Sequence, residues 1–82
     1  MPRVDVKVFG PLREVVRNDS LQIDLPPSAT GEEAFEVLAS QFPDLRRWRE
    51  SLRLAVNLEY VPFSTVLKSN DEISLIPPVS GG

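Results

Sequence analysis

The chain has 82 residues and a formal net charge of −3, which predicts one small globular domain and argues against nucleic-acid binding, since that needs a basic field. It contains no cysteine and no histidine, which excludes disulfides, thiolate metal sites and Ser-His or Cys-His catalysis. No stretch has the length of a membrane span, and residues 1–5 lack a signal-peptide core, so we expect a cytoplasmic protein with no membrane contact. Because cysteine and histidine are absent, we also expect no metal site.

Independent catalysis would have to rely on carboxylates, Lys7, Lys68 or Tyr60. We therefore expect a protein on which enzymes act, or a subunit that completes an enzyme, rather than an enzyme with its own catalytic residues.

The first quarter of the chain predicts two paired strands. Apolar residues alternate with polar ones over residues 3–9 and again over residues 21–25, the period of a half-buried strand. Gly10-Pro11 ends the first run, residues 12–16 suit one helical turn, and Asn18-Asp19 suits a turn. We expect the two strands to pair as antiparallel neighbours.

The main helix is predicted after Ser28. Thr30 and Glu33 have the spacing of a capping box, and Pro43 ends the helix at Gln41 or Phe42. An apolar stripe at three- and four-residue spacing predicts packing on a sheet; its members are Ala34, Phe35, Leu38 and Phe42.

Residues 44–51 suggest a second short helix, with three arginines around Trp48. In a basic protein this pattern would suggest nucleic-acid binding. Because the chain is acidic, we interpret it as a solvated helical face with the indole against the body.

The second half predicts three more strands. Alternation predicts a strand over 54–58, a short edge strand over 65–67 and a last strand over 72–76. The turn before the last strand contains Asn70, which tolerates positive φ. The strong apolar faces of the first and last strands predict central positions, giving an α+β fold with a mixed sheet of four to five strands on one main helix.

The last six residues predict a thin extended tail. Pro77 and Pro78 cannot donate to a sheet ladder, and the final Gly81-Gly82 leaves a backbone slim enough to thread a narrow channel. Fully extended, the stretch from Pro78 to Gly82 would reach about 16 Å. We expect a domain over 1–76 and a flexible tail over 77–82 that presents the Gly82 carboxylate, although frayed ends without function are common.

This arrangement resembles the β-grasp, or ubiquitin-like, fold and, more narrowly, the family of small subunits of molybdopterin synthase, which are sulfur carriers. The resemblance covers nearly the whole chain and is most specific in its ending. The matching segments are Val8-Phe9, Leu12-Arg13-Glu14, Ala55-Val56-Asn57, Asp71-Glu72-Ile73 and Ile76-Pro77-Pro78-Val79-Ser80-Gly81-Gly82. Departures are Asn70, where the family often has glycine, and Ile76, where it often has an aromatic residue.

The resemblance implies that the reactive group is the Gly82 carboxylate. A ubiquitin-activating-like adenylyltransferase would adenylate Gly82 with ATP, and a sulfur donor enzyme would convert it to a thiocarboxylate. The tail formed by Pro77, Pro78, Val79, Ser80 and Gly81 would thread into the large subunit of a heterotetramer, which supplies the catalytic residues. Sulfur would pass to cyclic pyranopterin monophosphate, with no cofactor bound by this chain.

The resemblance also implies a partner-facing patch of apolar side chains with one charge, made of Phe9, Arg13, Tyr60, Phe63 and Ile76. For Phe9 and Ile76, core packing is an open alternative, and Arg13 has local acids with which it can pair instead.

Three alternatives remain for the function. The chain is also compatible with a sulfur carrier of thiamine, cysteine or thiolated-tRNA synthesis, with a modifier joined to lysines, and with an interaction module whose tail is inert.

Overall fold

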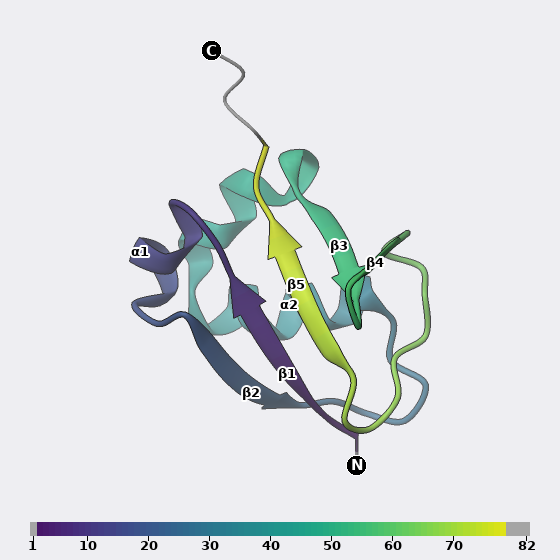
Figure 1. Ribbon diagram of the computed structural model, residues 1–82. Helices are drawn as coiled ribbons and strands as arrows, with labels where there is room; N and C mark the ends of the chain where they lie inside the picture. The colour runs from purple at the N-terminus through teal and green to yellow at the C-terminus, as the bar shows by residue number, and fades with distance from the viewer. Residues whose placement is uncertain (1, 79–82) are drawn as a thin grey trace.

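Five strands and three helical segments follow one another in the computed structural model, which describes residues 2–78 (Figure 1). Met1 and the predicted tail positions Val79, Ser80, Gly81 and Gly82 lie outside the described residues. The elements in chain order are β1 (Arg3–Val8), α1 (Leu12–Val16), β2 (Ser20–Asp24), α2 (Gly31–Gln41), the 3₁₀ helix η1 (Pro43–Ser51), β3 (Arg53–Val56), β4 (Glu59–Val61) and β5 (Glu72–Ile76).

The strands form one mixed sheet in the order β2-β1-β5-β3-β4. β1 pairs antiparallel with β2 and parallel with β5, while β5 pairs antiparallel with β3. The first and last strands therefore occupy the centre of the sheet, and α2 crosses behind it (Figure 1). This mixed sheet on one main helix is the β-grasp arrangement that the sequence predicts.

The core lies between the sheet and α2. Val4, Val6 and Val8 of β1 are at most 2% exposed, because alternate residues of a strand face the same side. Three members of the predicted helical stripe are buried against them, and the fourth, Phe42, is half-buried at the end of α2. Full burial of a valine, leucine or phenylalanine side chain contributes about 1.5–3 kcal/mol.

The start of α2 is held by its own cap and by a distant loop. Thr30 and Glu33 form the predicted capping box. The amides of Gly31 and Glu32 donate to the carbonyls of Thr65 (3.0 Å) and Phe63 (2.9 Å). Four amides at a helix N-terminus lack partners within the helix, and these contacts satisfy the first two while tying the loop after β4 to α2.

The predicted strand over 54–58 is wrong beyond Val56. Asn57 and Leu58 have φ values of 50° and 72° and form the two-residue turn of a β3–β4 hairpin. Two consecutive residues with positive φ match a type I′ turn, whose twist suits a hairpin. Leu58 is consequently 88% exposed rather than on a strand face.

The edge strand was also predicted in the wrong place. The strand that closes this edge is β4, whereas the segment 65–67 contributes only an isolated bridge between Val66 and Thr30. Pro62 follows β4 directly and cannot donate to the ladder, so pairing with β3 stops at Val61.

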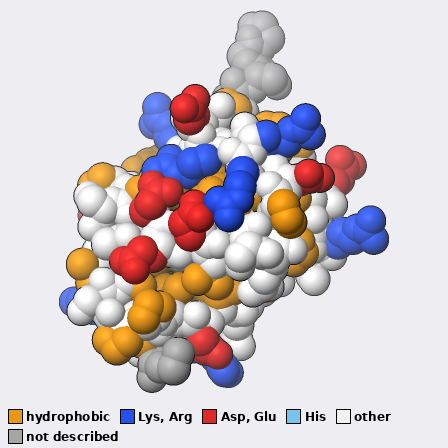
Figure 2. Space-filling model, turned by 180° about the vertical axis from the view of Figure 1, so that it is seen from behind, with side chains coloured by type: hydrophobic (Ala, Val, Ile, Leu, Met, Phe, Trp, Pro, Cys, Tyr) orange, Lys and Arg blue, Asp and Glu red, His pale blue; other side chains and the backbone are white. Residues whose placement is uncertain are grey.

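The segment 44–51, predicted as a short helix, lies within η1, where Leu45 is buried and Trp48 packs half-buried against the core as expected. Figure 2 views the molecule from the helix side and shows basic and acidic side chains intermingled on this face. Part of this mixture is the ion pairing of η1 with α2, through Arg46 with Glu36 and Arg49 with Glu32.

The turn before β5 has the predicted left-handed residue, Asn70, with a φ of 73°. Asp71 closes the turn by accepting a hydrogen bond from the Lys68 amide at 2.8 Å and another from the Asn57 side chain at 3.0 Å. This turn therefore joins the β3–β4 hairpin to the start of β5.

Candidate functional site

The site begins where the chain leaves the sheet. β5 ends at Ile76, Pro77 is half-buried and Pro78 is exposed. Gly10, with a φ of 57°, lies so close that a Cβ built on it would be 3.4 Å from Pro77 Cγ. The base of the predicted tail thus follows the central strand β5 and lies against the loop after β1.

Two small side chains and one aromatic ring lie side by side on the sheet face opposite the core. Ala55 lies between Ser74 of β5 and Tyr60 of β4 in the register. Ala55 and Ser74 have small side chains and are 6% and 5% exposed, while Tyr60 stands out at 62%.

A cavity of about 510 Å³ opens at the root of the tail. It brings together four of the predicted site residues, namely Tyr60 and Ile76 from the proposed partner interface and Pro77 and Pro78 from the proposed stem. The complete lining is Ser51, Arg53, Tyr60, Ile76, Pro77 and Pro78. Ile76 is half-buried, and it lies opposite Arg53 in the register.

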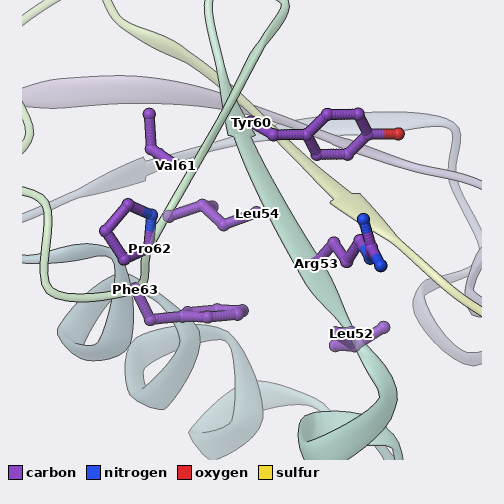
Figure 3. A pocket seen from close by; sticks show the side chains of 7 residues that line it. All are labelled: Leu52, Arg53, Leu54, Tyr60, Val61, Pro62 and Phe63. Carbon is purple, nitrogen blue, oxygen red and sulfur yellow. The ribbon is translucent and has the colours of Figure 1, made fainter.

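Phe63 lines a neighbouring cavity of about 360 Å³ that also includes Arg53 and Tyr60. In Figure 3 the Phe63 ring lies toward the helices, whereas the Tyr60 ring projects from the other side of the sheet. The Arg49 guanidinium stacks on the Phe63 ring, 3.6 Å from its centroid. Phe63 is half-buried, which limits its part in the partner-facing patch, and Tyr60 belongs to β4.

Phe9 and Arg13 line a third recess, next to the β1–α1 loop. Phe9 is 44% exposed, so the structure places it outside the buried core. Arg13 and Asp19 form an exposed ion pair at 3.6 Å, a contact that contributes little to stability. The five predicted interface residues thus line three recesses between them.

An ion pair between η1 and α2 supports the fold near Phe63. Arg49 donates through Nε to Glu32 Oε2 at 2.9 Å and also donates through Nη2 to Oε1. Hydrogen bonding to Arg49 lowers the pKa of Glu32, and the same contact raises the pKa of Arg49. This pair fixes η1 against α2 and holds the guanidinium over Phe63.

The residues that sequence reasoning missed are Arg53 and Ser51. Arg53 precedes Ala55 by two positions, so the alternation of β3 places both on the outer face, and that signal was present in the sequence. Ser51 gave no such signal, because it is the last residue of η1.

Within residues 2–78, no helix is long and apolar enough to cross a bilayer, and no three His, Cys, Asp or Glu side chains are grouped as metal ligands. The described part of the site therefore consists of exposed recesses around the start of the tail.

Residues 6–82 match the model of the ThiS family. The chain belongs to the ThiS family. Among curated relatives, the molybdopterin synthase sulfur carrier subunit of Dictyostelium discoideum is 40% identical over 94% of this chain and 93% of its own length. The protein of the same description from Arabidopsis thaliana is 35% identical over 96% and 84%.

Solved structures agree with this ThiS-family fold. SAMP1 from Haloferax volcanii superimposes with a TM-score of 0.87 at 27% identity, covering 98% of this chain and 99% of that one. A chain in the complex of subunits 1 and 2 of molybdopterin-converting factor from Helicobacter pylori gives a TM-score of 0.69 at 28% identity, covering 98% and 99%. The β-grasp prediction is confirmed.

Proposed function

We propose that this chain is the sulfur carrier subunit of molybdopterin synthase and carries sulfur on the carboxyl group of Gly82. The observation that supports this most is similarity over nearly the full length to curated sulfur carrier subunits of that synthase, at 35–40% identity in the two relatives described above. The ending Pro-Pro-Val-Ser-Gly-Gly, placed directly after a central strand, supports the same assignment.

The chemistry takes place at the end of the tail and needs no catalytic side chain from this protein. A carboxylate is a poor electrophile, so ATP first converts Gly82 to an acyl adenylate with release of pyrophosphate. A sulfur donor enzyme then delivers sulfur to this carbonyl carbon, AMP leaves, and a thiocarboxylate forms. Transfer of the sulfur to cyclic pyranopterin monophosphate, with water supplying the replacing oxygen, returns Gly82 to a carboxylate.

The partners follow from this cycle. The activating enzyme is an adenylyltransferase of the ubiquitin-activating type, and the large synthase subunit accepts the loaded tail and supplies the catalytic residues within a heterotetramer. The solved complex of the two converting-factor subunits from Helicobacter pylori supports a partnership of this kind. We place the cycle in the cytoplasm.

Intact mass spectrometry tests the proposal. Incubation with ATP, the activating enzyme and a sulfur source should add about 16 Da to the free chain, because sulfur replaces one oxygen. A variant lacking Gly82 is the control and should remain unchanged. If the mass of the intact protein stays the same under conditions that load a known carrier, the proposal is wrong.

A second function is a protein modifier, supported by the likeness to the SAMP1 structure described above. Both routes begin with the same adenylate, but a modifier ends in an isopeptide bond to a lysine. The same experiment in cell extract distinguishes them, since conjugation produces adducts larger by the mass of a whole target protein.

Carriers of thiamine, cysteine or thiolated-tRNA synthesis would share the mass change. Binding to the large synthase subunit decides between these pathways, and a chain that bound a thiazole synthase instead would contradict the pathway proposed here.

A further inference from the structure

Arg53 is a cation placed at the root of the tail. It is the first residue of β3, lies on the outer face of the sheet and pairs in the register with Ile76, the last residue of β5. Its side chain is exposed and lines the 510 Å³ cavity. It also lines the neighbouring 360 Å³ cavity, which is the one shown in Figure 3. A molecule that takes hold of the tail close to the body would therefore meet this guanidinium.

No acid neutralises Arg53 within the described residues. Ion pairs shorter than 4 Å are present there for five other basic residues, and Arg53 is not among them; the paired residues are Arg3, Lys7, Arg13, Arg46 and Arg49. The nearest defined partner of Arg53 is the Tyr60 ring, with its centroid 5.8 Å from the guanidinium carbon. An arginine beside an aromatic face keeps its five N–H donors in a fixed plane, available to a carboxylate.

The surroundings favour an acidic side chain carried on an apolar surface. The walls of the larger cavity are apolar where Ile76, Pro77 and Pro78 contribute, and its residues with polar groups are Ser51, Arg53 and Tyr60. When such a recess is covered, water is excluded and a charged hydrogen bond becomes stronger.

The distribution of charge points the same way. Residues 43–53 contain four arginines and two acids, whereas the whole chain has a net charge of −3. Arg46 and Arg49 of this segment are paired with Glu36 and Glu32 of α2, whereas Arg53 lines the cavity at the tail root. Complementary charge at an interface guides association and fixes the register of the two surfaces.

We propose that Arg53 is a docking residue that pairs with an aspartate or glutamate of the large synthase subunit, seated in the cavity at the tail root when the tail is inserted. This inference rests on the proposed function, because it takes the large subunit as the partner. The pair would add orientation to a binding mode in which insertion of the tail alone leaves the body free to rotate.

Charge reversal at this position tests the inference. The variants are Arg53→Glu and Arg53→Gln, and the matched control is Arg17→Glu, which makes the same change of charge at the end of α1, on the β2 side of the sheet (Figure 1). The dissociation constant of each full-length chain for the large subunit is measured by calorimetry at low and high salt. Thermal unfolding of each variant verifies that the fold is retained.

The expected result is a loss of affinity of about tenfold or more for Arg53→Glu at low salt, a smaller loss for Arg53→Gln, and a change within about twofold for Arg17→Glu. A compensating Asp→Arg or Glu→Arg change on the large subunit should restore binding of Arg53→Glu, and this rescue identifies the acidic partner.

The outcomes separate this inference from the function on which it rests. If the unmodified chain does not bind the large subunit, the proposed function fails and the pairing fails with it. If the unmodified chain binds and Arg53→Glu binds as well as Arg17→Glu, the pairing with Arg53 is wrong while the function stands. If Arg53→Glu loses affinity for the activating enzyme but keeps its affinity for the large subunit, the pairing proposed here is also wrong.

Discussion

Leu58 has a backbone conformation that residues with a branched apolar side chain rarely adopt. Its φ of 72° is in the left-handed region, and its side chain is 88% exposed, so little burial compensates for the conformational cost. Only glycine, and to a lesser degree asparagine, adopts this conformation easily. The preceding Asn57 suits its place in the turn, which leaves Leu58 as the unfavourable residue of the hairpin.

Replacing Leu58 by glycine should stabilise the protein. Asn-Gly is a preferred pair for a type I′ turn, and relief of the left-handed strain should exceed the extra chain entropy lost by glycine, for a net gain of about 0.5–1 kcal/mol. Urea unfolding followed by circular dichroism measures the gain.

The control for this prediction is Leu58→Ala, which removes most of the side chain but keeps a Cβ at positive φ. It should leave the free energy of unfolding nearly unchanged. If alanine stabilises as much as glycine, the exposed leucine side chain rather than the backbone is responsible, and the argument from φ is wrong.

At the scale of elements, the contact between η1 and α2 depends on pH. The pKa of Glu32 is lowered below its ordinary 4.5 by hydrogen bonding to Arg49. Because the folded pKa is below the unfolded one, the ion pair stabilises the fold above about pH 4.5 and loses this contribution as the pH falls through the folded pKa.

Glu32→Gln should therefore destabilise the protein most near neutral pH. Because the Glu32 side chain is 45% exposed, solvent screening limits the loss to about 1 kcal/mol or less. The difference from the unmodified chain should shrink below pH 4.5 and vanish once Glu32 is protonated. Denaturant unfolding over this pH range measures it.

Glu59→Gln, a change at an exposed acid of β4, is the matched control and should show no such trend. A pH-independent difference for Glu32→Gln would mean that packing of η1, rather than charge, explains the loss.

Some helices and strands can be predicted from the sequence, and others cannot. β1 and α2 were predictable because their signals are local, namely the alternating valines and the capping box at Thr30 and Glu33. The β3–β4 hairpin was missed because its turn lacks glycine and Leu58 continues the alternation of β3. The loop after β4 is held to α2 by the carbonyl groups of Phe63 and Thr65. Every residue has a carbonyl group, so the local sequence gives no sign of this contact.

The candidate site was predictable in its chemistry more than in its geometry. The sequence alone indicates the prolines after β5 and the residues Tyr60 and Ile76 as site residues. Arg53 gains its significance only because β3 lies beside β5, a pairing between segments far apart in sequence. The division into a domain over 1–76 and a tail over 77–82 stays a prediction.

At the scale of the whole molecule, the reactive end and the folded body should respond to mutation independently. Gly81→Ala adds one methyl group to the stem, which should hinder threading into a narrow channel. We expect a fall in synthase activity of about tenfold or more, with the melting temperature unchanged because the change lies beyond β5. Activity assays beside thermal unfolding test both parts.

The companion variant is Ser80→Ala, which trims the stem without adding bulk and should retain most of the activity. A large fall in melting temperature for Gly81→Ala would show that Gly81 contributes to the body and would contradict its place in the stem.

The parallel pairing of β1 with β5 has a consequence for biosynthesis. The ladder at the middle of the sheet joins Val6 to Ile73, so a growing polypeptide cannot complete its core until nearly every residue has left the ribosome. Cooperative folding is delayed when such distant segments must meet. A ribosome that stalls early would release a chain whose core cannot form, and such a chain would be open to degradation. The carrier molecules that remain would therefore be those translated through β5 as far as the stem.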